Sequence, residues 1–171
     1  MLFRSLFFSA LISTYLIFLG ESLVGPLPHE ILNIPVTSAS TFVLLMSSLT
    51  MVLAVYGAQH GRLGMMKLML LATILLGLVF LGFQAYEFTS FVHEGLGLTT
   101  NQFGSSFYVL TGFHGTHVAV GVLWLMTMFF IDMKRGLKGK TDVLLVDICA
   151  LYWHFVDVVW IAIFTLIYLI Q

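Results

Sequence analysis

Five long apolar runs, each long enough to cross a membrane as a helix, dominate the 171-residue sequence. A helix needs about 20 predominantly apolar residues to cross the hydrocarbon core of a bilayer. The runs cover residues 6–24, 38–58, 68–91, 105–131 and 143–170. We therefore predict an all-α, polytopic membrane protein, with a single bundle of five transmembrane helices that forms one membrane domain over residues 1–171.

The composition excludes a soluble domain. Charged residues make up 9% of the chain and hydrophobic residues 60%, whereas soluble domains are about one quarter charged. A formal net charge of −1 leaves no basic excess for binding nucleic acid. The single cysteine, Cys149, excludes an internal disulfide and a cysteine metal cluster.

The basic residues orient the predicted bundle. All seven lie before the first span, or in or beside the second and fourth connectors: Arg4, Arg62, Lys67, Lys134, Arg135, Lys138 and Lys140. Because Lys and Arg accumulate in cytoplasmic loops, we predict a cytoplasmic N-terminus and a C-terminus on the outside. A cleaved signal peptide is the alternative for the first span, but no good A-x-A-like cleavage site follows it.

Ionisable residues within the apolar runs are the main functional signal, because they are costly in lipid and usually face protein or water. They are Glu21, Glu87, His114, His117, Asp147, His154 and Asp157. Counting about 1.5 Å of rise per residue from the basic end of each span places Glu87, His117 and Asp157 at similar depths, about 25–30 Å away. We therefore predict a buried polar layer in the outer half of the bundle, formed by the third, fourth and fifth spans, with His114, His154 and Asp147 as further members.

Three chemical uses of this layer remain open beside the simplest one, which is hydrogen bonding between helices. His114 and His117 are three apart and share a helix face, and with His154 and Asp157 they have the side chains to ligate zinc or iron. Haem ligation by His117 and His154 is the second use. A proton relay through Glu87 is the third, although the height of Glu87 near the outer rim argues against a deep role.

Small residues in the fourth span predict a helix-packing face. Gly112, Gly115 and Ala119 lie three and four residues apart, and small residues let two backbones approach closely. We expect this line to lie against another helix, either of the bundle or of a partner.

Three segments resemble one known family. SSFYVLTGFHGTHVAVG in the fourth span and YWHFVDVVWIAIFTLIY in the fifth are similar to the two signature segments of subunit III of haem–copper terminal oxidases. GFQAYEF in the third span resembles the glutamine-to-glutamate segment of that family. The similarity runs from about residue 26 to the C-terminus, and the five-span length resembles the shorter bacterial form of the subunit.

The resemblance implies an accessory subunit that binds no haem or metal itself. Haem and copper belong to partner subunits, and the chain packs on the catalytic subunit I, holds phospholipids, and supports proton uptake and lasting activity in the bacterial cytoplasmic membrane. Glu87 matches the carbodiimide-reactive glutamate of the family, and His60 a histidine at the cytoplasmic end of the preceding span. The signature positions are matched by His114, His117, His154 and Asp157.

Two departures from the family pattern concern acidic residues. The family commonly has a Ser-Glu pair in the first span, where this chain has Ser13-Thr14, and an acidic residue three positions after the glutamate, where this chain has Ser90. A lipid or proton role for the first-span glutamate therefore does not carry over.

Two classes of function follow from the sequence. The first is an accessory, non-catalytic subunit of a proton-pumping oxidase that reduces oxygen to water, with cytochrome c favoured as electron donor and quinol as the alternative. The second is a free-standing small membrane transporter or metalloprotein that uses the polar layer directly. A partner that carries haem would distinguish the two classes.

Overall fold

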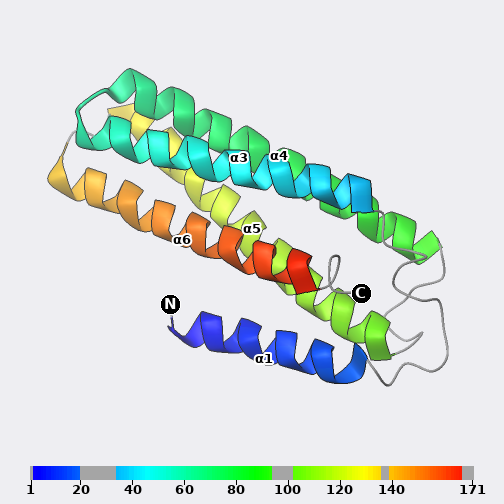
Figure 1. The fold of residues 1–171 in the computed structure, drawn as a ribbon. Helices are drawn as coiled ribbons and strands as arrows, with labels where there is room; N and C mark the ends of the chain where they lie inside the picture. Colours follow the sequence, from blue (N-terminus) through cyan, green and yellow to red (C-terminus); the bar gives the residue numbers. More distant parts are fainter. Residues whose placement is uncertain (1, 20–33, 94–101, 136–138, 167–171) are drawn as a thin grey trace.

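The computed structural model describes residues 2–19, 34–93, 102–135 and 139–166, and nearly all of these residues are helical. The helices are α1 (Leu2–Leu19), α3 (Ile34–Gln59), α4 (Leu63–His93), α5 (Gln102–Arg135) and α6 (Lys140–Phe164). They lie lengthwise beside one another in a bundle (Figure 1). The predicted all-α fold is confirmed.

Helices of membrane-spanning length and composition overlap the predicted spans. Within the described part of the chain, four segments qualify: Pro35–Gln59, Leu63–Ser90, Tyr108–Lys134 and Asp142–Phe164. The first predicted span coincides with α1 up to Leu19, but its remaining residues, with Glu21, lie outside the described residues. The last residues of the fifth predicted span, 167–170, also lie outside them.

Successive helices run in alternating directions (Figure 1). The end of α3, the start of α4, the end of α5 and the start of α6 therefore share one end of the bundle with the start of α1. An ion pair at this end joins Lys67 Nζ on α4 to Asp132 Oδ2 on α5 at 3.5 Å, with the Asp132 side chain fully buried. Of the described basic residues, Arg62, Lys67 and Lys134 thus lie at the end where the sequence places the cytoplasmic side.

A tight turn joins α3 to α4 and draws the two helices together. Gly61 has a φ of +68°, a conformation in which glycine carries no steric penalty. The Arg62 N–H donates to the Gly57 carbonyl at 2.8 Å. A Cβ atom on Gly57 would lie 2.9 Å from the Met66 backbone nitrogen. Only glycine permits such a close approach of the two backbones.

Helix α6 has an inward face that contacts three neighbouring helices. Trp153 is 1% exposed, and its ring fills the space left by two glycines. A Cβ atom would lie 2.8 Å from the Trp153 ring if placed on Gly77 of α4, and 3.0 Å from it if placed on Gly121 of α5. The size of Trp153 and the absence of side chains at the two glycines are therefore complementary.

Helix α1 packs against α5 at the edge of the bundle (Figure 1). Its contact includes Phe8, which is 3% exposed and whose ring meets the His117 ring edge-on, with centroids 5.2 Å apart. The exposed large apolar side chains on the other helices face outward, as expected of a protein whose solvent is lipid.

Candidate functional site

Hydroxyl groups on α3 provide anchors for the two buried tryptophans of α6. Trp153 Nε1 donates to Ser47 Oγ at 3.0 Å, and Trp160 Nε1 donates to Thr41 Oγ1 at 3.0 Å. Both hydroxyls are buried and donate in turn to backbone carbonyls one turn earlier in α3. Each indole N–H, which would be costly to leave unpaired in lipid, is therefore satisfied.

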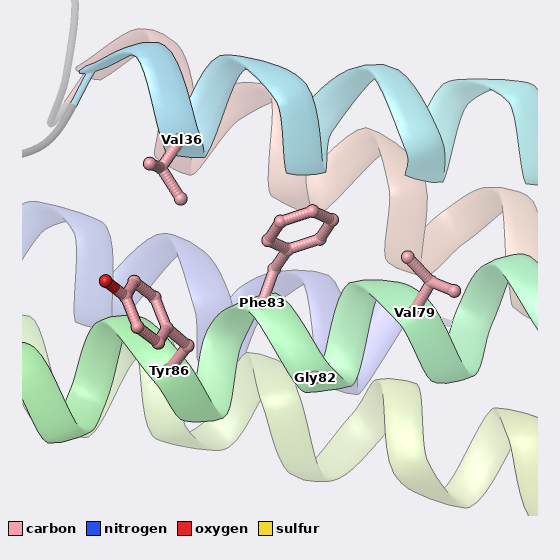
Figure 2. A pocket seen from close by; sticks show the side chains of 5 residues that line it. All are labelled: Val36, Val79, Gly82, Phe83 and Tyr86. Atoms are coloured by element: carbon pink, nitrogen blue, oxygen red, sulfur yellow. The ribbon is translucent and has the colours of Figure 1, made fainter.

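Glu87 on α4 pairs with α3 near the opposite end of the bundle from the Lys67–Asp132 ion pair. Glu87 is 5% exposed, and its carboxyl group accepts a hydrogen bond from Thr37 Oγ1. An apolar groove of about 460 Å³ lies beside this pair. Figure 2 shows Val36 of α3 facing Phe83 and Tyr86 of α4 across the groove, which Val79 and Gly82 also line.

His154 and Asp147 occupy a second groove, between α6 and α3. The Ser48 hydroxyl lies 2.6 Å from His154 Nδ1, and Gln59 Nε2 donates to Asp147 Oδ1 at 3.3 Å. The groove has a volume of about 300 Å³, and the two ionisable residues line it together with Val52, Val55, Ala150 and Leu151.

The two histidines of α5 face different helices. His114 is completely buried and stacks on Trp160 of α6, with centroids 4.8 Å apart and planes at 27°. His117 instead faces α1 through Phe8, and its Nδ1 bonds the Phe113 carbonyl oxygen at 2.7 Å. A spacing of three residues leaves the two side chains about 60° apart around the helix, so neighbouring positions of one face can meet different helices.

These contacts differ from the predicted polar layer in two ways. Asp147 lies about 15 Å along α6 from Asp157, and its partner Gln59 is about 33 Å along α3 from Thr37, which binds Glu87. Asp147 therefore lies at the opposite end of the bundle from Glu87 and outside any common layer. The His117 ring also points away from the other members, toward Phe8 of α1.

The predicted packing residues are placed unequally. A Cβ atom on Gly115 would lie 3.1 Å from Gln84 Oε1 on α4, which is close packing. Around Gly112 no described atom lies within 4 Å of such a Cβ, and Ala119 is half-buried. The prediction overlooked Gly77 and Gly121, which receive Trp153.

His60 lies at the end of the bundle that holds the basic residues. It follows α3, is exposed, and stacks on Tyr56 with ring centroids 4.0 Å apart. Its Nδ1 lies 3.0 Å from the Tyr56 carbonyl oxygen. The described contacts of His60 are therefore local.

The prediction from the sequence did not single out the hydroxyl residues of α3. Thr37, Thr41 and Ser48 recur at spacings of four and seven, which places them on one helix face. This periodicity was available in the sequence, but hydroxyl residues are ordinary in apolar helices, whereas ionisable ones are rare. Helix α3 therefore contributes most of the polar partners that the prediction sought in the third, fourth and fifth spans.

The fold and the site together define a class: a membrane helical bundle whose interior polar groups join one helix to the next. Comparison with known proteins identifies the family within that class. The family model described as Cytochrome c oxidase subunit III matches residues 1–171. The chain belongs to this family, the third subunit of the haem–copper oxidases.

Relatives with either of two names are similarly close. Cytochrome c oxidase subunit 3 of Bacillus sp. (strain PS3) is 43% identical over 97% of this chain and 80% of its own length. Quinol oxidase subunit 3 of Bacillus subtilis (strain 168) is 41% identical over 95% of this chain and 79% of its own length. The predicted family is thus confirmed, as is the function as subunit III of a haem–copper oxidase.

Proposed function

We propose that the chain is the non-catalytic accessory subunit of a proton-pumping respiratory oxidase, in which it stabilises catalytic subunit I and supports proton uptake there. The observation that carries this proposal is the use of the interior polar groups. Thr37, Thr41 and Ser47 join α3 to Glu87 and to the two buried tryptophans, so these groups hold helices together. Haem and copper then belong to partner subunits.

Metal chemistry by the chain itself has little support in its geometry. In residues 2–19, 34–93, 102–135 and 139–166, no three His, Cys, Asp or Glu side chains are grouped as metal ligands. The histidines that the sequence suggested as a ligand set contact different helices: His117 faces α1, His154 faces α3 and His114 faces α6.

Depletion of the chain from the purified oxidase tests the accessory role. We expect the remaining complex to keep its full haem content and its initial rate of oxygen reduction, but to lose activity faster during turnover than the complete oxidase. Addition of the chain back should restore its lifetime. A near-stoichiometric metal in the purified chain that is lost in His117→Ala would overturn the proposal.

A phospholipid acyl chain is the proposed occupant of the groove between α3 and α4. The groove is about 460 Å³ and lined by apolar groups, with Val79 48% and Tyr86 64% exposed. Its rim faces the lipid phase, and apolar walls of this size match a hydrocarbon chain better than water.

Filling the groove tests this occupant. A Cβ on Gly82 meets no described atom within 4 Å, so Gly82→Phe projects a ring into the groove without an initial clash at Cβ. We expect the purified oxidase to lose about one bound phospholipid. Leu75→Phe, on the same helix at a 54% exposed position outside the groove, is the matched control and should lose none. Equal lipid content in Gly82→Phe and wild type would contradict the proposal.

The electron donor and the membrane are also proposals. We favour cytochrome c as donor, in line with the name of the family model, with quinol as the alternative because quinol oxidase subunits are equally similar. Turnover of the purified oxidase with reduced cytochrome c, but not with quinol, would support this choice. We place the chain in the bacterial cytoplasmic membrane, with the Lys67–Asp132 end inside.

A single introduced cysteine tests the orientation. Cys149 is 2% exposed and gives little background labelling. In right-side-out vesicles, Arg62→Cys should resist a membrane-impermeant thiol reagent until the membrane is opened, and immediate labelling would reverse the orientation.

A further inference from the structure

Three buried side chains inside the bundle carry polar atoms without a hydrogen-bond partner. Gln84 on α4, His114 on α5 and Asp157 on α6 are 6%, 0% and 4% exposed. The unpartnered atoms are Gln84 Oε1, both ring nitrogens of His114 and both carboxyl oxygens of Asp157. Such atoms are rare in folded proteins, where nearly all buried polar groups bond to protein or to ordered water.

The inward face of α6 places Asp157 between the two tryptophans. Trp153, Asp157 and Trp160 are spaced four and three residues apart and so share one face of the helix. Trp160 on this face contacts both His114 of α5 and Phe80 of α4, with ring centroids 4.8 Å and 5.0 Å away. Asp157 is therefore within one helical turn of the residue that stacks on His114.

Gln84 reaches the same region from α4. Its Nε2 donates to the Thr111 carbonyl at 3.0 Å, one turn before His114. Its Oε1 lies 3.1 Å from where a Cβ on Gly115 would be, directly after His114 in the chain. Phe80, one turn before Gln84 on α4, meets the His114 ring edge-on at 6.0 Å. Gln84 thus contacts α5 on both sides of His114 in the chain, and the Trp160 ring that stacks on His114 is one turn from Asp157 on α6.

Protein groups nearby do not complete these bonds. Trp160 stacks on the His114 ring, and the Phe80 ring lies perpendicular to it. The N–H of Trp160 is donated to Thr41 and Phe80 has no polar atom, so neither side chain bonds the His114 ring nitrogens. Ser48 of α3 neighbours the Asp157 carboxyl group, but its hydroxyl lies 2.6 Å from His154 Nδ1 and carries a single hydrogen, so at least one carboxyl oxygen is left without a donor. The remaining partner that fits both donors and acceptors is water, which commonly makes two to four bonds in such sites.

We propose that ordered water molecules bind inside the bundle between α4, α5 and α6, where they bridge Gln84 Oε1, the ring nitrogens of His114 and the Asp157 carboxyl group. Water suits this position because it donates to Gln84 and to the carboxyl group and accepts from the His114 N–H. The site is separate from both lipid-facing grooves, whose lining residues include none of these three. It does not depend on the accessory role of the chain.

A map of the intact oxidase that resolves ordered water tests the site. We expect water density within about 3.2 Å of Gln84 Oε1 and of at least one atom of His114 or Asp157. If the map instead shows His114 and Asp157 in direct contact, or shows ordered water elsewhere in the bundle but none here, the proposal is overturned.

A variant makes the test specific. Gln84→Met keeps an unbranched side chain of similar length and removes both polar atoms, so the density beside residue 84 should disappear while His114 and Trp160 stay stacked. Gln59→Met, at the end of α3 beside Asp147, is the matched control and should leave the interior density unchanged. Interior density that persists in Gln84→Met would show that Gln84 does not hold the water. If Gln84→Met does not assemble, the wild-type map alone decides.

Discussion

The surroundings of Trp153 and Trp160 show two ways of fixing a large ring inside a membrane bundle. Both rings lie on one face of α6, and both indole N–H groups donate to an α3 hydroxyl at 3.0 Å. Their other neighbours are opposite in size. Trp153 fits because Gly77 and Gly121 have no side chains, whereas Trp160 lies among the rings of Phe80 and His114. The polar anchor is the same, but the packing is specified by different residue types.

Truncation of either tryptophan should have the largest effect. Trp153→Ala and Trp160→Ala each remove a side chain that is 1% exposed, and such changes cost about 3–5 kcal/mol of unfolding free energy. We expect retention of the chain in the purified oxidase and its midpoint of thermal unfolding to fall sharply. Leu151→Ala, at a 58% exposed position on α6, is the control. If Trp153→Ala behaves like Leu151→Ala, the bundle does not depend on this ring.

Addition of one methyl group should show how tightly the Trp153 ring is packed against its glycines. Gly77→Ala puts a Cβ 2.8 Å from the Trp153 ring, and over-packing of this kind costs about 1–3 kcal/mol. Gly82→Ala, on the same helix with no described atom within 4 Å of its Cβ, should be neutral or slightly stabilising, because alanine favours helix more than glycine. The two thermal midpoints decide the matter, and equal midpoints would mean that the ring moves aside freely.

Removal of the hydroxyl anchors should have a smaller effect that is similar at the two sites. Ser47→Ala and Thr41→Val each leave an indole N–H without its acceptor, and hydrogen bonds between membrane helices are worth about 0.6–2 kcal/mol. A double-mutant cycle of Ser47→Ala with Trp153→Phe isolates the bond from the packing. A coupling energy near zero would show that the Ser47 hydroxyl contributes through its own helix only.

Replacement of Glu87 should have the smallest effect on assembly and activity, because a glutamine can keep the hydrogen bond from Thr37. Glu87→Gln keeps the size and the acceptor oxygen, so assembly, turnover and proton pumping should remain nearly at wild-type levels. A carbodiimide, which attacks protonated carboxyl groups in apolar surroundings, should label wild type but no longer label this variant. A variant that assembles fully and yet loses most of its pumping would assign Glu87 a role in proton transfer.

The candidate site was only partly predictable, for a geometric reason. Counting residues gave similar depths for Glu87, His117 and Asp157, but depth does not determine direction around a helix. His117 faces α1 and His114 faces α6, although they are three residues apart. Asp147 shares a groove with His154 yet lies near the end that carries the basic residues, so membership of a common layer was the wrong inference for it.

The sequence by itself determined the all-α membrane fold, the approximate positions of the helices and the family, because long apolar runs and long signature segments are local properties of the chain. Only the tertiary structure decided which helix each polar group meets. The hydroxyls of α3 accept hydrogen bonds from Trp153 and Trp160, which lie more than 100 residues later in the chain. Gly77 is likewise complementary to a ring on another helix. Such pairings depend on the rotation of each helix about its axis, and that rotation is set by the packing of all the helices together.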